Sequence, residues 1–272
     1  MIAASPTIGY IHEPFGLRHR PGVCRARFDV WFPYVSSADG ARYEPALRDT
    51  LAFRYSIGAE LRAVRSPRDL ARAARDAARF GSMRRRRLRP LVKDPVALFS
   101  APWLAETFDM QVVLLVRHPA AFAASVTSSG WRFPFDHFLR QPRLMADLLE
   151  PFRSEIEQFA ATERDIIDQA VLLWLLTNHA VVEYTSRHPG WLLVRHEDLA
   201  LDAVARFREL YERLEVPFGP TEQAVIQARS DAGTVSAWRT RLTPEEIERV
   251  RTATERAASA FYSDRDWESR SG

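Results

Sequence analysis

Short runs of apolar residues alternate along the chain with longer segments whose apolar residues recur every three or four positions. The short runs are typical of β-strands, and the longer segments are typical of amphipathic helices. We expect strands at Ile8–His12, Pro90–Lys93, Val112–Val116 and Trp191–Val194. Because strands that alternate with helices indicate βαβ units, the predicted fold class is α/β, with a central parallel sheet flanked by helices.

Capping patterns mark the expected helices. Ser66, followed by a proline and an acidic residue, predicts a helix start, and Gly81 is the expected end of that helix. Thr243, followed by Pro-Glu-Glu, forms a second capping box that opens a C-terminal helix. Apolar positions spaced by three and four over residues 163–187 predict a long helix with a buried face.

Length and composition indicate a globular protein. The chain has 272 residues, of which 46% are hydrophobic and 27% charged, and we expect a single domain over residues 1–272. The most apolar segment, 170–182, is too short and interrupted to predict a membrane span, and the N-terminus has no signal-peptide pattern. The single cysteine, Cys24, excludes a disulfide framework. These features predict a soluble, cytoplasmic protein.

The charge of the chain favours an anionic small ligand. The formal net charge is +3 and the isoelectric point is near 9.3, with the excess spread along the chain. Nucleic-acid-binding domains usually cluster their basic residues. The one concentrated run, four arginines at 84–87 on an expected loop, is more typical of a solvated patch than of a nucleic-acid arm. We therefore expect no nucleic-acid partner.

A charged residue ends the most apolar of the expected strands. Val112–Val116 is apolar on both faces, as in a central strand, and Arg117 follows it at the edge where α/β sheets bind ligands. Pro119 then begins a helix that carries Phe122 and Ser125 on one face. A guanidinium and a hydroxyl so placed can bracket a phosphate. The spacing leaves open the alternative that the arginine pairs with a core carboxylate and the serine only permits close packing.

Two further residues stand where strands end. The chain has 38 lysine and arginine residues, but its only lysine is Lys93. Lysine is a compact, movable charge, which favours a functional role, although its retention by chance is the alternative. Glu13 follows another strand and precedes Pro14, which disfavours helical backbone at Glu13. It is a loop carboxylate at the same edge and a candidate general base.

Several other chemistries lack their residues. The His12-Glu13 pair does not continue as H-E-x-x-H, because Gly16 stands where the second histidine is needed, and we predict no metal site. The chain contains no G-x-G-x-x-G, no G-x-x-x-x-G-K-[ST] and no G-x-S-x-G. Dinucleotide binding, Walker-type phosphate binding and serine-hydrolase chemistry therefore have no sequence support.

At this point the chain resembles the sulfotransferases that use 3′-phosphoadenosine 5′-phosphosulfate (PAPS). The segment VVLLVRHPAAFAAS is similar to the family's 3′-phosphate element, a strand followed by an arginine and then a serine. LLVRHEDL and VSAWRTRLTPEEI resemble a later strand and the C-terminal segment of the family. EPF resembles the glutamate loop of bacterial and carbohydrate-type members, and VKDP lies where cytosolic members carry a lysine that touches the sulfuryl group.

The resemblance implies a P-loop-NTPase-like sheet and sulfuryl transfer from PAPS to a hydroxyl or amine of a small molecule or glycan, without a metal. Glu13 would be the base, and Lys93 would stabilise the charge on the transferred group. Cytosolic members have a catalytic histidine just after the lysine; here that region holds Asp94 and Pro95, so the base role moves to Glu13.

The resemblance also implies which residues bind the donor and its product, 3′,5′-adenosine bisphosphate (PAP). Arg117 and Ser125 would hold the 3′-phosphate, with Arg239 as a further candidate for that phosphate. His196 would lie against the adenine. Trp238 could belong to either the core or the nucleotide site.

One departure from the family concerns the start of the chain. The family opens with a strand and a loop whose backbone amides hold the 5′-phosphosulfate, whereas MIAASPTIGYIHEPF resembles the helix end and strand that come after them. We therefore expect this first strand and loop to be missing before residue 1. Such a chain would have low or no activity, and unpaired strand edges would favour aggregation or homodimerisation.

Two alternatives to an active sulfotransferase stay open from the sequence. One is a non-catalytic remnant of the same fold that acts as an interaction module. The other is a different nucleotide-dependent transferase such as a kinase, against which the missing Walker lysine argues.

Overall fold

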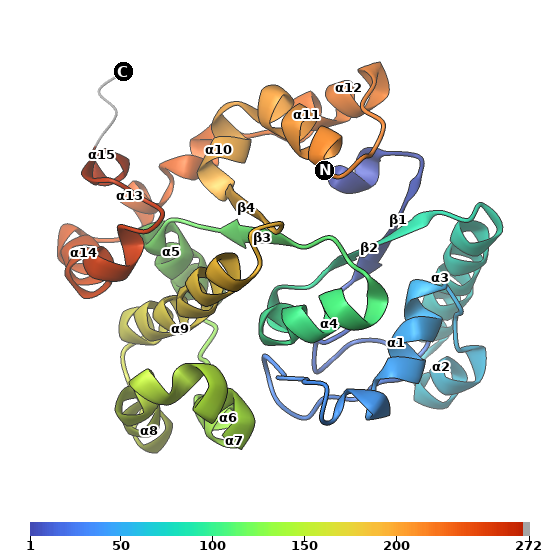
Figure 1. Ribbon diagram of the computed structural model, residues 1–272, viewed down its shortest axis with the longest axis horizontal. Coiled ribbons are helices and arrows are strands. Elements are labelled where there is room, and N and C mark those ends of the chain that lie inside the picture. Colours follow the sequence, from blue (N-terminus) through green and yellow to red (C-terminus); the bar gives the residue numbers. More distant parts are fainter. Residues whose placement is uncertain (269–272) are drawn as a thin grey trace. The chain divides into compact units, whose positions relative to one another are not determined.

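The computed structural model describes residues 1–268, and the chain divides into two compact units (Figure 1). The first unit comprises Met1–Met110 and Leu210–Val225, and the second comprises Gln111–Glu209 and the residues from Ile226 onward. Compact units of this kind are not by themselves separate folding domains, so the prediction of one domain stays a prediction.

The first unit combines one pair of strands with several helices. Its elements are η1 (Ile2–Ala4), β1 (Ile8–His12), η2 (Gly40–Arg42), α1 (Glu44–Leu51), α2 (Ile57–Ala63), α3 (Pro67–Arg85), β2 (Arg89–Lys93), η3 (Pro95–Ser100) and α4 (Ala101–Phe108). Two further helices are divided between the units. The end of α11 (Ala203–Arg213) and the start of α12 (Pro220–Arg229) belong to the first unit, and their other ends belong to the second.

The second unit also holds one pair of strands. Its elements are β3 (Val113–Val116), α5 (Pro119–Ser129), α6 (Asp136–Leu139), α7 (Pro142–Leu144), η4 (Met145–Leu149), η5 (Glu150–Phe152), α8 (Arg153–Ala161), α9 (Ile166–Arg187), β4 (Leu192–Arg195), α10 (His196–Leu201), η6 (Ala232–Val235), α13 (Trp238–Arg241), α14 (Pro244–Ala258) and α15 (Asp264–Trp267).

All four expected strands form, and their pairing is parallel. β1 pairs with β2 so that His12 lies opposite Lys93, and β3 pairs with β4 so that Val116 lies opposite Arg195. Among residues 1–268 the strands make two separate two-stranded ladders, not the one central sheet that we expected. The α/β class and parallel pairing are confirmed, whereas the P-loop-like sheet and the missing first strand stay predictions.

The capping patterns placed most helix starts correctly. The Ser66 hydroxyl accepts the Asp69 N–H at the start of α3, and Thr243 and Glu246 form the expected capping box of α14. Gly81 does not end α3, which continues to Arg85, because an isolated glycine costs a helix only about 1 kcal/mol. The arginine run was also placed wrongly, because its first half belongs to this helix.

Each unit has its own core. In the first unit, Ile11 of β1 packs with aromatic and aliphatic side chains that include Phe53 and Phe80. Glycine is required at position 9 of β1, because a Cβ there would lie 2.3 Å from the Phe53 ring. In the second unit, the buried alanines of α5 let this helix pack against α9 and α14.

One strand and one helix differ from a simple core arrangement. Leu115 of β3 is 55% exposed, so the strand is not buried on both faces as its sequence suggested.

Within residues 1–268, α9 is by its length and composition able to cross a membrane. Most of its apolar window is buried inside the unit, as in the core helix of a soluble protein, and the absence of a membrane span stays a prediction.

Candidate functional site

The first cluster of candidate residues lies where β1 and β2 end. Because His12 and Lys93 are paired, Glu13 directly follows one strand beside the last residue of the other. The Glu13 N–H donates to the Lys93 carbonyl at 3.0 Å, and the Lys93 ammonium donates to Glu13 Oε1 in an ion pair. Their side chains are 37% and 53% exposed, so both charges are accessible to a ligand. The chain's only lysine therefore contacts the candidate base.

The backbone at Glu13 is unusual. Its φ of 45° lies in the left-handed region, which costs a residue with a side chain about 1–3 kcal/mol unless its surroundings hold it there. The Gly16 N–H donates to the Glu13 carbonyl at 3.2 Å and closes a tight turn around Pro14. His12 Nδ1 lies 3.5 Å from Glu13 Oε1. The turn places the carboxylate beside two groups that can carry positive charge.

The second cluster lies where β3 and β4 end. Since Val116 and Arg195 are paired, Arg117 and His196 both follow the same edge of this ladder. Burial lowers the pKa of the Arg117 guanidinium, with Glu197 acting in the opposite direction and Arg241 in the same direction. Burial, and then the charge of Arg117, lowers the pKa of His196. The charge of Arg117 thus acts on His196, and the charge of Arg241 acts on Arg117.

Arg117 has no side-chain partner in the described part of the chain. Its Nε is buried without a hydrogen bond, and no ion pair neutralises the guanidinium. His196 Nδ1 is likewise buried and unpartnered. Glu197, whose charge acts on Arg117, forms no ion pair with it in the described chain and accepts instead from the His118 N–H at 2.9 Å and the Tyr262 hydroxyl at 3.0 Å. Two neighbouring arginines that form no ion pair are suited to an anion with more than one negative charge.

Ser125 differs from the other serines of α5. Ser128 and Ser129 donate their hydroxyls to carbonyls of their own helix, at 2.7 and 2.8 Å. Ser125 is exposed, and its hydroxyl makes no hydrogen bond to residues 1–268. Its hydroxyl is therefore accessible to a ligand, and its role in phosphate binding stays a prediction.

Arg239 is engaged elsewhere. Its guanidinium donates to the Trp267 carbonyl at 2.8 Å and to the carbonyl of Glu268, and it stacks 4.1 Å over the Trp238 ring. Trp238 itself is 3% exposed and belongs to the core of the second unit. Arg241, three residues after Trp238 in α13, was not among the expected site residues. Its charge acts on Arg117, and it has no ion-pair partner in the described chain.

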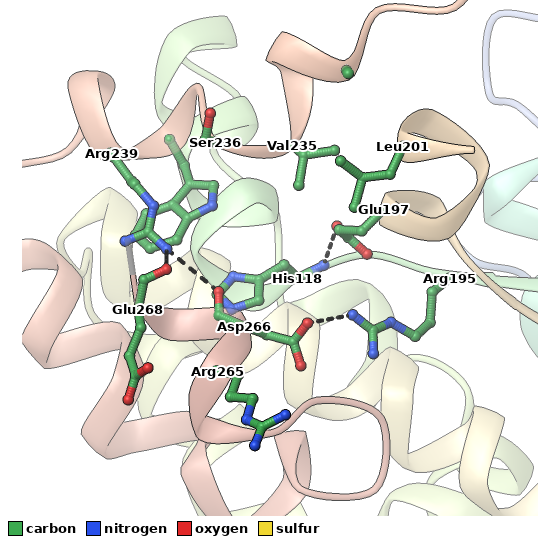
Figure 2. Close-up of a pocket in the computed structure, with 12 residues that line it drawn as sticks. His118, Arg195, Glu197, Leu201, Val235, Ser236, Arg239, Arg265, Asp266 and Glu268 are labelled. Atoms are coloured by element: carbon green, nitrogen blue, oxygen red, sulfur yellow. Dashed lines mark hydrogen bonds and ion pairs between the residues drawn. The ribbon is translucent and has the colours of Figure 1, made fainter. Parts of the chain in front are cut away.

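A cavity of about 300 Å³ lies beside the second cluster (Figure 2). Its lining includes His118, which is 2% exposed and has no hydrogen bond on either ring nitrogen. The ring stacks on Trp238 at 5.1 Å and meets Tyr262 and Trp267 edge-on. Burial lowers the pKa of His118 to about 3, so the imidazole is neutral and offers one donor and one acceptor.

Four of the six charged side chains that line this cavity are already engaged, and Arg265 and Glu268 are the other two. Arg195 forms an ion pair with Asp266, Arg239 donates to backbone carbonyls, and both oxygens of Glu197 accept hydrogen bonds (Figure 2). His118 was not among the expected site residues, although the alternation of side chains along a strand sends Arg117 and the residue after it to opposite sides. The buried lining atoms without a hydrogen bond are the two ring nitrogens of His118 and Nε of Arg195.

Metal binding has no support in the described residues. Residues 1–268 contain no group of three or more histidine, cysteine, aspartate or glutamate side chains that could hold a metal ion. The lone Cys24 is buried, and burial raises the pKa of its thiol.

Comparisons with known proteins were made for the whole chain. No family model matches it, and no curated protein matches it. One solved structure, "Sulfotransferase Domain from the Curacin Biosynthetic Pathway", is similar over 78% of this chain and 78% of its own, with 16% sequence identity and a TM-score of 0.44. A likeness at that level establishes neither fold nor function, so the site is argued from its own geometry.

Proposed function

We propose that this protein is a sulfotransferase that moves the sulfuryl group of PAPS to a hydroxyl or amine of a small molecule or glycan. The observation that carries the proposal is the contact between the Glu13 carboxylate and the Lys93 ammonium at the ends of paired strands. A base beside a cation suits a reaction in which a proton leaves the acceptor while negative charge develops on the leaving oxygen.

In the proposed reaction, the acceptor oxygen or nitrogen attacks the sulfur and forms a new bond to it. The bond from sulfur to the bridging phosphate oxygen breaks, and PAP leaves with the electron pair. Glu13 accepts the acceptor's proton, and Lys93 offsets charge on the sulfuryl and bridging oxygens. Because the two side chains form an ion pair, a sulfuryl group that draws the ammonium away frees the carboxylate to act as a base.

The second cluster is considered by itself, as a candidate site for a 3′-phosphorylated nucleotide such as PAP. Arg117 and Arg241 would bind the 3′-phosphate, since neither forms an ion pair in the described chain, and the Ser125 hydroxyl would donate to it. The cavity beside His118 is the candidate place for the adenine, because the neutral imidazole and the Trp238 ring stacked on it can contact a flat uncharged base. His196 stays a candidate for contact with the same base.

The transfer assay uses the full chain, radiolabelled PAPS and a panel of phenolic, alcoholic, amine and sugar acceptors. We expect labelled product with the wild type and a loss of about 10²–10⁴-fold in Glu13→Gln, the usual contribution of a general base. Glu215→Gln is a matched control, because Glu215 also has a left-handed φ, of 54°. Lys93→Met tests the electrostatic role. Equal activity of Glu13→Gln and Glu215→Gln would refute the assignment of the base.

Calorimetry tests the nucleotide assignment independently of turnover. We expect PAP to bind more tightly than ATP, and Arg117→Gln and Ser125→Ala to weaken PAP binding. Ser128→Ala is the control, because its hydroxyl already bonds within α5. A preference for ATP would favour a kinase, and PAP binding without transfer to any acceptor would favour a non-catalytic module.

A further inference from the structure

Asp94, the residue after Lys93, connects three segments of the first unit. Its Oδ2 accepts the Phe15 N–H at 2.7 Å, and its Oδ1 accepts the Val96 N–H at 3.1 Å as the N-cap of η3. The carboxylate thus connects the end of β2 to the Glu13 turn, 79 positions away in the sequence, and to the start of the next helix. Each of the two carboxylate oxygens therefore accepts one backbone N–H.

The turn that Asp94 holds is one that needs restraint. Glu13 has its φ at 45°, and a residue with a side chain stays there only where neighbouring contacts over-determine it. Three contacts do so: the Glu13 N–H to the Lys93 carbonyl, the Gly16 N–H to the Glu13 carbonyl, and Asp94 to Phe15. The Phe15 ring is 1% exposed and stacks on Phe28 at 4.6 Å, which anchors the far side of the turn.

The carboxylate is kept in a position that is costly for its charge. Burial, with a smaller contribution from Glu13, raises the pKa of Asp94 to about 6, while its two backbone hydrogen bonds and Lys93 act in the opposite direction. The raised pKa of the Cys24 thiol is due mainly to burial, with a small contribution from the charge of Asp94. An uncharged side chain would avoid the desolvation cost, but it could not accept two N–H donors as strongly.

We propose that Asp94 is a positioning residue for sulfuryl transfer, because its carboxylate holds the turn that keeps the Glu13 carboxylate against Lys93. This inference rests on the proposed function. Asp94 touches the backbone of the turn and neither candidate catalytic side chain, so it acts through Glu13 and not on the substrate.

The test compares Asp94→Asn with the wild type in the full chain by two measurements. Asparagine has one acceptor oxygen, so one of the two N–H donors loses its partner. We expect kcat to fall by about tenfold or more, as for a lost hydrogen bond to a charged group, with KM for PAPS unchanged. We also expect the amide hydrogens of Glu13, Phe15 and Gly16 to exchange faster with solvent, while those of α3 exchange as before. The acidic limb of the kcat–pH profile should change, since the variant has no carboxyl to titrate at this position.

Asp165→Asn is the matched control. Asp165 caps α9 and accepts the Ile167 N–H at 2.9 Å, so this variant also loses a capping carboxylate, but in the other unit. We expect its kcat and the exchange of the three turn amides to match the wild type. If Asp94→Asn changes neither, the inference is wrong; if kcat falls while exchange is unchanged, Asp94 acts directly and positioning is wrong. A wild type inactive on every acceptor would refute the proposed function, whereas the exchange rates would still decide whether Asp94 holds the turn.

Discussion

Replacing His118 by phenylalanine tests the electrostatics of the second unit. The imidazole is 2% exposed among aromatic rings, and both of its nitrogens lack a hydrogen bond. Phenylalanine keeps a flat ring that can stack on Trp238 and removes the titratable group. Because no protein hydrogen bond is lost, we expect the variant to unfold at pH 7.5 with a free energy within about 1.5 kcal/mol of the wild type.

The difference in the free energy of unfolding between the wild type and His118→Phe should appear on acidification. Burial lowers the pKa of His118 from 6.5 to about 3, so between these values the unfolded state binds more protons than the folded state. Stability from this group is therefore fully present above pH 6.5 and is lost as the pH falls toward 3. The whole shift corresponds to about 5 kcal/mol, and about 3 kcal/mol of it should be lost by pH 4.5.

Urea unfolding followed by circular dichroism at pH 7.5 and pH 4.5 measures this difference. We expect the wild type to lose about 3 kcal/mol more than His118→Phe between the two pH values. His188→Phe is the control, because His188 also stacks on a tryptophan, Trp191 at 4.3 Å, but is only partly buried. Parallel pH dependence of the wild type and His118→Phe would refute the reasoning, and so would an NMR titration of His118 near pH 6.5.

Two other predictions concern the remaining charged groups. Since burial raises the pKa of Asp94 from 3.8 to about 6, the folded state binds more protons in that interval; urea unfolding should show the wild type gaining about 2 kcal/mol as the pH falls from 6 to 4, and Asp94→Asn should lack this gain. Arg241→Ala should weaken PAP binding about tenfold in calorimetry, the effect of losing one charged hydrogen bond. Arg239→Ala should mainly lower the melting temperature, because its guanidinium donates to backbone carbonyls. If Arg239→Ala weakened PAP binding more than Arg241→Ala, Arg239 would be the phosphate-binding residue.

Local patterns predicted the four strands and the helices α3, α5, α9 and α14, but not short helices such as α1, α2 and α6. The four strands lie within a residue or so of their expected bounds, and Pro119 and the capping residues mark where three helices begin. These features depend on neighbours in the sequence, which is why the sequence reveals them. The end of α3 was predicted wrongly because it is not a local property: whether a helix continues past a glycine depends on what its next turn packs against.

The sequence identified the candidate residues by their position at strand ends, but it did not predict the hydrogen-bond and ion-pair partners of these residues. The contact of Glu13 with Lys93 joins residues 80 positions apart and depends on the register of β1 and β2. The choice between Arg239 and Arg241 depends on carbonyls near residue 267, which no spacing rule connects to them.

The sequence by itself determined the α/β class, the positions of the strands, several helix starts and which residues stand where strands end, because periodicity, caps and strand length are local properties. Only the tertiary structure decided that the strands form two ladders, that Glu13 adopts a left-handed turn against the one lysine, and that His118 is a buried neutral ring beside a cavity. The physical reason is that burial, pairing and desolvation arise between segments distant in the chain, and these decide which charged and polar groups keep a partner.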